Sequence, residues 1–196
     1  MTEQMSVKIA ALPSLRLTVE AHGLMAKKAL GQNFLLDQNI TDKIINLSLQ
    51  KQNKKDFSGA NVFEVGPGPG GLTRAVLAAE PKSLTVVEMD ERCIAIMNEI
   101  KEKTGDILHI INGDAMQTDF SVLAPAPRHI ISNLPYNISV PLLVGWLKNI
   151  NAYDSLTLMF QKEVAERITA PIKTKDYGRI SVLSQLQCRI DHLLDL

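Results

Sequence analysis

This chain of 196 residues contains few cysteines and few aromatic residues, and its formal net charge is zero. Its two cysteines, Cys93 and Cys188, lie far apart and in no spacing typical of metal ligands, which predicts reduced, packed thiols in a cytoplasmic protein. The 21 basic residues equal the 21 acidic residues, so the total charge does not indicate a nucleic-acid-binding protein. No hydrophobic run is long enough to span a membrane. These absences exclude disulfide-rich and membrane-spanning classes and leave a globular protein with one substantial core.

The first part of the chain has no strong pattern. Residues 1–25 are expected to form an N-terminal extension with one short helix, in which residues 1–13 are loosely ordered. Ser14 follows a proline and can cap a helix that ends at Gly23. Residues 26–37 follow neither the helical nor the strand period, which predicts an ordered loop.

From residue 60 onward, strand-like and helix-like runs alternate. The strand-like runs are 61–65, 83–87, 107–111, 129–132 and 155–160, and the helix-like runs are 72–79, 92–103, 140–149, 161–169 and 179–189. Ser139 is the expected cap of the third helix, with Pro141 in its first turn. Such alternation predicts an α/β fold with a mostly parallel sheet and helices on both faces. Residues 190–196 resemble a strand with no closing turn, so the last strand of the sheet is expected to be missing.

A glycine-rich segment follows the first predicted strand. It contains the pattern G-x-G-x-x-G at Gly66, Gly68 and Gly71, interrupted by two prolines, and Glu64 lies two residues before the first glycine. Glycines let the backbone turn sharply and approach a ligand next to a helix N-terminus. Dinucleotide-binding enzymes share the pattern, but the prolines and the preceding acid fit S-adenosylmethionine better. The alternative is a strand-to-helix turn without a ligand.

Acidic residues follow the next two predicted strands. Glu88 lies about 20 residues after the glycines, where a carboxylate can accept hydrogen bonds from both hydroxyls of a ribose. Asp90 is expected to cap the next helix instead. Asp114 follows the third strand and can accept a hydrogen bond from an adenine amino group, although a simple turn aspartate is an equal alternative. Because the carboxyl ends of parallel strands meet at one sheet edge, these residues indicate one crevice.

The segment Asn133-Leu134-Pro135-Tyr136 ends the fourth predicted strand and falls at the same edge. The amide oxygen of Asn133 and the backbone carbonyl of Leu134 can both accept hydrogen bonds from one amino group. Pro135 fixes the backbone, and the ring of Tyr136 can stack on a planar base. This arrangement suits an enzyme that holds an amino group while its nitrogen attacks an electrophile. A turn after a strand, without function, is the alternative.

Other kinds of site find little support. No Ser/His/Asp triad or metal-binding cluster is visible, and the scattered histidines are expected to be structural: His22, His109, His129 and His192. A nicotinamide-dependent oxidoreductase would share the glycine pattern, but its prolines and the lack of a hydride-site acid argue against that class.

With these motifs together, the chain resembles the ribosomal RNA adenine N6-dimethyltransferases, most closely the bacterial small-subunit type. The matching stretches are residues 28–35, 64–68, 87–90, 113–115, 133–139, 161–167 and 177–182, in family order. The resemblance implies a Rossmann-like class I S-adenosylmethionine-dependent methyltransferase fold over residues 26–196. Family members continue with a further strand and a small helical domain, so this catalytic domain is expected to be incomplete at its C-terminus.

The resemblance also implies a role for each site residue. Gln32, Asn33 and Leu35 would close over the methionine and ribose of the cofactor, S-adenosyl-L-methionine. Gly66 and Gly68 would pass beneath it, Glu88 would hold the ribose hydroxyls, and Asp114 would hold its adenine amine. Asn133 and Leu134 would hold the N6 amine of the target adenine, with Tyr136 stacked on its ring, and Asn133 is expected to contact the cofactor as well.

The implied activity is dimethylation of adjacent adenines at N6 in small-subunit ribosomal RNA, as part of ribosome biogenesis. The expected partner is this RNA or the immature small ribosomal subunit, with no metal and no membrane, and the protein is expected to be a cytoplasmic monomer. A base that leaves its stack or lies in a loop suits a single-stranded RNA target.

Several related classes stay open at this point. Enzymes that methylate adenine in DNA or the glutamine amide share the Asn-Leu-Pro-Tyr segment, but the stretch from Gly31 to Leu35 argues against both. Large-subunit relatives that confer antibiotic resistance share the architecture, and Leu134 and Asn137 favour the small-subunit type. A non-catalytic ribosome-assembly factor on this fold would tolerate loss of Asn133 or Glu88, and both are present.

Overall fold

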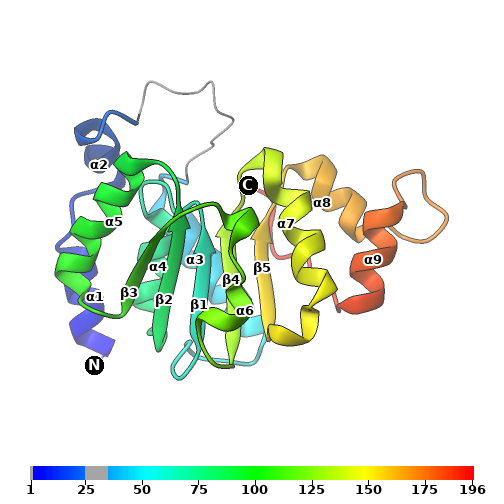
Figure 1. The fold of residues 1–196 in the computed structure, drawn as a ribbon, viewed down its shortest axis with the longest axis horizontal. Coiled ribbons are helices and arrows are strands. Elements are labelled where there is room, and N and C mark those ends of the chain that lie inside the picture. The colour runs from blue at the N-terminus through cyan, green and yellow to red at the C-terminus, as the bar shows by residue number, and fades with distance from the viewer. Residues whose placement is uncertain (1, 25–34) are drawn as a thin grey trace.

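The computed structural model describes residues 2–24 and 35–196, and within these residues five strands form one sheet in the order β3-β2-β1-β4-β5 (Figure 1). The strands are β1 (Asn61–Val65), β2 (Ser83–Glu88), β3 (Leu108–Asn112), β4 (Arg128–Asn133) and β5 (Ser155–Met159). All four pairings between neighbouring strands are parallel. The predicted parallel α/β sheet is therefore confirmed, and β1 lies at its centre between β2 and β4.

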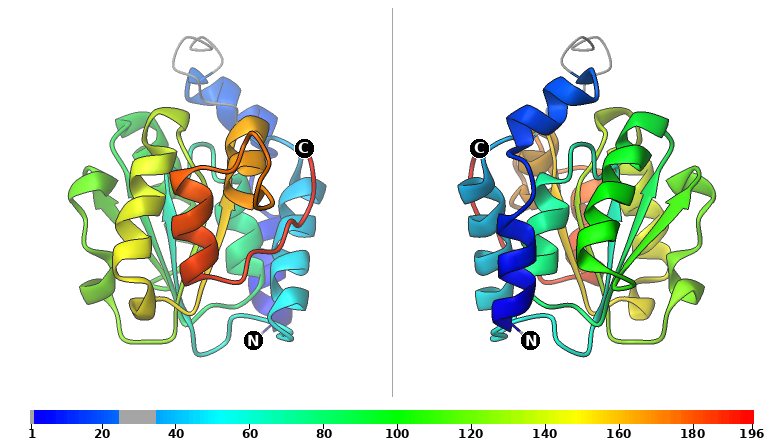
Figure 2. Two further views of the ribbon diagram at one scale, coloured as in Figure 1. Left: turned by 90° about the vertical axis from the view of Figure 1, so that its right-hand side faces the viewer. Right: turned by 90° about the vertical axis from the view of Figure 1, so that its left-hand side faces the viewer.

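One face of the sheet is covered by three helices that share a large hydrophobic core. They are α3 (Gln38–Lys51), α4 (Gly71–Ala78) and α5 (Glu91–Thr104). The apolar side chains of β1 and β2 that face them include Val62, Leu84 and Val86, which are all fully buried. The helices α1 (Thr2–Ala10) and α2 (Leu15–Ala21) form an outer layer, in which α1 packs on α4 and α5 (Figure 2).

The other face of the sheet packs against α6 (Phe120–Leu123) and α7 (Tyr136–Lys148). Phe63, Phe120 and Trp146 form a row of edge-to-face aromatic contacts between β1, α6 and α7. Beyond α7, a smaller apolar cluster joins β5 to α8 (Lys162–Thr169) and α9 (Arg179–Gln187). Two 3₁₀ turns complete the described elements, η3 (Ala115–Gln117) and η4 (Ile150–Ala152). No helix in the described ranges combines the length and hydrophobicity needed to cross a membrane.

The N-terminal residues are more ordered than the sequence predicts. The expectation of loose order over residues 1–13 is wrong, because Thr2–Ala10 forms α1. The predicted cap is confirmed, since Ser14 Oγ accepts a hydrogen bond from the amide of Leu17 at the start of α2. Arg74 of α4, which is 5% exposed, donates to the carbonyl oxygen of Pro13 and to the hydroxyl of Thr18. These bonds fix the N-terminal helices to the helix that follows the glycine loop.

Two predictions in the second half of the chain are corrected. The third predicted helix begins at Tyr136, not at residue 140, and Pro135 is its N-cap. The hydroxyl of Ser139 donates back to the carbonyl of Tyr136, so Ser139 lies within the first turns and does not cap the helix. The strand-like run at residues 190–196 forms no strand. Its residues are held by side chains instead, including an ion pair between Lys51 and Asp191.

The sheet has a topological switch point between β1 and β4. The chain runs outward from β1 to β2 and β3, and then returns to place β4 on the other side of β1. In open α/β sheets, ligands bind outside the carboxyl ends of the strands at such a point. The glycine loop follows β1 and the Asn-Leu-Pro-Tyr segment follows β4, so the two segments that the sequence singles out lie on either side of the switch point.

Candidate functional site

The glycine loop forms a tight, buried turn between β1 and α4. Gly66 has a φ of 64°, in the left-handed region that favours glycine, and a Cβ atom there would lie 3.4 Å from Cγ of Pro135. A Cβ atom at Gly71 would lie 2.5 Å from the carbonyl oxygen of Leu35, which no side chain could tolerate. The loop thus needs glycine at both ends, in one place for its turn and in the other for the close approach of the segment that precedes α3.

A buried carboxyl lies beneath this loop. Glu64, in β1, is 1% exposed, and the hydroxyl of Thr73 in α4 donates to its Oε2 at 2.7 Å. Burial raises the pKa of Glu64 to about 8, and the nearby charge of Glu88 adds to the rise, although the Thr73 bond opposes it. The bond between Glu64 and Thr73 spans the glycine loop and fixes the end of β1 to the first turn of α4.

Glu88 lies at the carboxyl end of β2, as predicted, and is 8% exposed. Its Oε1 accepts hydrogen bonds from the backbone amides of Met89 and Asp90, at 2.8 and 2.9 Å. Within the described ranges, Oε2 accepts no hydrogen bond. One carboxylate oxygen is therefore fixed by the backbone, and the other is available to a ligand that donates hydrogen bonds.

Asp90 and Asp114 lie at the starts of the elements that follow β2 and β3. The side chain of Asp90 accepts from the amide of Arg92, which confirms its predicted capping role in α5. Asp114 accepts from the amide of Met116 at 2.8 Å and caps the 3₁₀ turn η3, so the turn aspartate weighed as an alternative is present. This bond occupies Oδ1 of Asp114 and is compatible with a ligand at its other oxygen.

The sequence reasoning missed two exposed methionines in this crevice. Met89 directly follows Glu88 and is 66% exposed, while Met116 lies two residues after Asp114 and is 42% exposed. Large apolar side chains exposed beside ordered carboxylates are typical of ligand sites, which combine apolar surface with a few polar groups. The positions of both methionines, within two residues of the strand-end acids, could have revealed them.

The Asn-Leu-Pro-Tyr segment lies across the switch point from the glycine loop. Asn133 is the last residue of β4 and is partly exposed, whereas Leu134 is 2% exposed and packs into the core with α7. Tyr136 begins α7 and is also partly exposed. The buried Leu134 side chain anchors the segment, so its two polar neighbours are presented at the sheet edge.

The remaining predicted residues belong to the segment before α3. Leu35 is described, and it is partly buried against the core beside Gly71. Gln32 and Asn33 lie outside the described residues. On the other side of that gap, Arg92 donates to the carbonyl of Gly23 while its side chain pairs with Asp90. The described structure therefore brings Leu35, Gly66, Gly68, Glu88, Asp114, Asn133, Leu134 and Tyr136 to the carboxyl edge of the sheet and its neighbouring loops.

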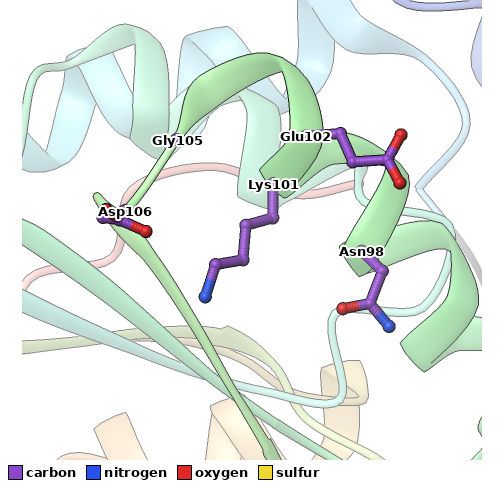
Figure 3. Close-up of a pocket in the computed structure, with 5 residues that line it drawn as sticks. All are labelled: Asn98, Lys101, Glu102, Gly105 and Asp106. Atoms are coloured by element: carbon purple, nitrogen blue, oxygen red, sulfur yellow. The ribbon is translucent and has the colours of Figure 1, made fainter.

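One hollow on the surface of the described residues lies away from this edge of the sheet. A shallow hollow at the C-terminal end of α5 is lined by Asn98, Lys101, Glu102, Gly105 and Asp106 (Figure 3). It lies at the opposite end of α5 from Glu88, because that helix begins directly after β2.

No group of histidine, cysteine or acidic side chains within the described ranges is arranged to hold a metal ion. Both cysteines are free thiols, and burial raises the pKa of Cys93 to about 12, which makes it unreactive.

The geometry of the crevice fits a ligand with a ribose and a planar base. The available oxygen of Glu88 suits a ribose hydroxyl, and the glycine loop lets the ligand approach the backbone. The exposed methionines offer an apolar surface for a base. S-adenosylmethionine has these parts, and so does a nicotinamide dinucleotide, so the fold of the crevice by itself does not choose between them.

Comparison with known proteins resolves this ambiguity. Residues 23–196 match the family model described as "Ribosomal RNA adenine dimethylase". The chain belongs to this family. The match begins after α2, so both N-terminal helices lie before the matched residues. As an S-adenosylmethionine-dependent family, it implies S-adenosyl-L-methionine as the cofactor, in agreement with the prediction.

Relatives in bacteria are similar over most of this chain. The "Ribosomal RNA small subunit methyltransferase A" of Gluconobacter oxydans is 51% identical over 175 residues, which cover 89% of this chain and 56% of that protein. The protein of the same name from Paramagnetospirillum magneticum is 46% identical over 188 residues, which cover 96% of this chain and 65% of that protein. The chain thus spans less than two thirds of the length of these relatives.

Solved structures agree with the family assignment. A dimethyladenosine transferase from Plasmodium falciparum has a TM-score of 0.68 and 30% identity, and the match covers 80% of this chain and 54% of that one. The 23S rRNA methyltransferase ErmE has a TM-score of 0.56 and 26% identity over 78% of this chain and 55% of its own. These similarities confirm the predicted class I methyltransferase fold.

Proposed function

We propose that this protein transfers methyl groups from S-adenosylmethionine to the N6 amines of adjacent adenines in small-subunit ribosomal RNA, dimethylating them during ribosome biogenesis. The observation that carries the proposal is the placement of the glycine loop with Glu88 on one side of the switch point and Asn133 on the other. Family membership and the names of the bacterial relatives support the choice of RNA.

On the cofactor side, the residues bind and orient. Glu88 would accept hydrogen bonds from the ribose through its available oxygen, and Asp114 would accept one from the adenine amine. Gly66 and Gly68 would let the cofactor lie against the backbone, with Gln32, Asn33 and Leu35 closing over its methionine and ribose. Met89 and Met116 would contact the adenine ring. S-adenosylmethionine itself supplies the electrophilic methyl group.

On the substrate side, the residues make the target amine reactive. The lone pair of an adenine amine is delocalised into the ring, which makes the nitrogen a poor nucleophile. Two acceptors, Oδ1 of Asn133 and the carbonyl of Leu134, would bind its two hydrogens and favour a pyramidal nitrogen whose lone pair points at the methyl group. Tyr136 would stack on the ring. Orientation and the fixed acceptor dipoles account for the rate increase, and the alkylated nitrogen can lose its proton to water.

The wider setting follows from this chemistry. A base that must leave its stack favours a single-stranded stretch of RNA in an immature small ribosomal subunit. We further propose that residues 26–196 form the catalytic domain with residues 1–25 as an extension, and that the protein acts as a cytoplasmic monomer. Size-exclusion chromatography with light scattering tests the last point, and a stable dimer would refute it.

The function is tested by methyl transfer to undermethylated small ribosomal subunits, with dimethyladenosine measured by mass spectrometry. Asn133→Ala should reduce transfer at least about a hundredfold, because it removes an acceptor that acts on the transition state. Its affinity for S-adenosylhomocysteine should stay within about twofold of wild type. Asn98→Ala, which removes an exposed amide in the middle of α5, is the control and should leave transfer unchanged. Full transfer by Asn133→Ala would refute the proposed role.

A further inference from the structure

The neighbouring strands β1 and β4 separate before they end. The ladder between β1 and β4 pairs Asn61 with Arg128 and continues only to Phe63 with Ile130. On their outer sides both strands stay paired to the end, since β1 pairs with β2 through Val65 and β4 pairs with β5 through Asn133. The last residues of β1 and β4 are therefore not joined to each other by backbone hydrogen bonds of the ladder.

One side chain bridges this gap. The hydroxyl of Ser132 donates to the carbonyl oxygen of Val65 at 2.7 Å and accepts from the amide of Val65 at 3.3 Å. Ser132 is 0% exposed and Val65 is 2% exposed. A buried backbone amide or carbonyl without a partner is costly, so the hydroxyl takes the place of the missing ladder bonds and satisfies both groups of Val65.

The bridge lies directly before both functional loops. Val65 is followed by Gly66, the first residue of the glycine loop, and Ser132 is followed by Asn133. The next contact between the loops is apolar, because Pro135 packs close to Gly66. A hydrogen-bonded bridge and a van der Waals contact at neighbouring positions thus join the cofactor loop to the substrate loop.

We propose that Ser132 is a positioning residue that sets the separation between the glycine loop and Asn133. The inference rests on the proposed function, in which these two loops hold the methyl donor and the attacking amine. The serine side chain is short and is bonded to both polar groups of one residue, so it fixes the separation of the two strands where their ladder has ended. Methyl transfer depends on that spacing, since a misplacement of about 1 Å can reduce a rate about a hundredfold.

The test compares two buried serines. Ser132→Ala keeps nearly the same volume but loses the bridge, and it should lower kcat about ten- to hundredfold at saturating substrates. Its Kd for S-adenosylhomocysteine should stay within about twofold, because each loop remains intact. The matched control is Ser48→Ala. Ser48 is 3% exposed, and its hydroxyl bonds to that of Thr157 at 2.7 Å in the core, where it joins α3 to β5 and not β1 to β4. This variant should keep the wild-type kcat.

A second readout reports the bridge itself. Hydrogen exchange at the amide of Val65 should be slow in the wild type and faster in Ser132→Ala, while amides of β2 keep their protection. If Ser132→Ala does not fold, Ser132→Cys replaces the hydroxyl by a weaker hydrogen-bonding group of similar size and should show an intermediate loss of kcat.

The outcomes separate this inference from the proposed function. A wild-type kcat in a folded Ser132→Ala or Ser132→Cys protein would overturn the inference, and so would an equal loss in Ser48→Ala. Loss of cofactor affinity without loss of kcat would also overturn it, because the serine would then support only the glycine loop. If the wild-type protein binds the cofactor but methylates no RNA, the proposed function itself fails, and the inference with it.

Discussion

The helix that follows the glycine loop is buried far more completely than the last helix of the chain. In α4, seven of the eight residues are buried, because the helix is enclosed between the sheet and the N-terminal helices. In α9, only Ser181 and Ser184 are buried, and the apolar side chains of Val182 and Leu186 are 47% and 80% exposed. The strands associated with these helices differ in the same way. Every residue of β1 is buried, whereas only the central residue of β5 is buried.

This difference indicates which part of the fold is most completely buried. The cofactor loops belong to the buried region of β1, α4 and β2, and the polar bonds of Arg74, Arg92 and Thr73 reinforce it. The helices α8 and α9 pack through one smaller apolar cluster, which they share with α7 and β5. Precise binding sites benefit from rigid support, so we expect the cofactor side to be the most stable part of the molecule.

The largest effect that tests this comparison is on stability. Leu77→Ala in α4 removes a fully buried side chain and should lower the free energy of unfolding by about 2–5 kcal/mol. Leu186→Ala in α9 removes an exposed one and should change it by no more than about 0.5 kcal/mol. Urea unfolding of both variants measures the difference. Similar losses in the two variants would mean that the regions do not differ in packing as described.

The next effect concerns ligand binding on the buried side. Glu88→Ala should weaken S-adenosylhomocysteine binding roughly ten- to hundredfold, because a hydrogen bond to a charged acceptor is lost. Glu91→Ala, three residues along and exposed at the start of α5, is the control and should bind like the wild type. Titration calorimetry gives both constants. An unchanged Kd for Glu88→Ala would remove this residue from the site.

Another effect on this buried side depends on the pH and on Glu64. Burial raises the folded-state pKa of this carboxyl from 4.5 to about 8, so its contribution to stability is fully present below pH 4.5 and is lost as the pH rises through 8. Within that window the loss is about 1.4 kcal/mol for each pH unit. Glu64→Gln cannot ionise, and its advantage over wild type in unfolding experiments should grow from pH 5 to pH 8. A constant difference would contradict the assigned pKa.

His129, in β4, should give the opposite slope. Its ring is fully buried, with its nitrogens bonded to Lys54 and Ser155. Burial and, to a smaller extent, the charge of Lys54 lower its pKa from 6.5 to about 4, although Asp154 opposes the change. The stability that it contributes is present above pH 6.5 and is lost as the pH falls toward 4. An NMR titration of the ring checks this, and protonation near pH 6.5 in the folded protein would refute it.

The sequence allowed correct prediction of features that depend on local pattern. The five strands begin and end within two residues of their predicted limits, because buried parallel strands are short apolar runs between turns. The caps at Ser14 and Asp90 were also predictable, since a capping side chain bonds to residues two or three positions along. Alternation of strands and helices then located the site, because the parallel topology brings every strand end to one edge.

Features that depend on distant partners could not be predicted in this way. Residues 190–196 have a strand-like pattern, but a strand forms only where a neighbour offers a ladder, and here side-chain contacts replace it. The bridge from Ser132 to Val65 joins residues 67 positions apart, and the approach of Leu35 to Gly71 is equally non-local. The predicted start of α7 is too late because serine is a common capping residue and Ser139 suggests a cap, whereas the N-cap is Pro135 and the helix begins at Tyr136.

The most direct test of the central claim is titration calorimetry of this protein with S-adenosylhomocysteine and, separately, with NAD. We expect micromolar-scale binding of S-adenosylhomocysteine and no binding of NAD, because in the proposed function Glu88, the glycine loop and the residues around Asn133 form an S-adenosylmethionine site. A folded protein that binds NAD, or that binds neither ligand, would contradict it.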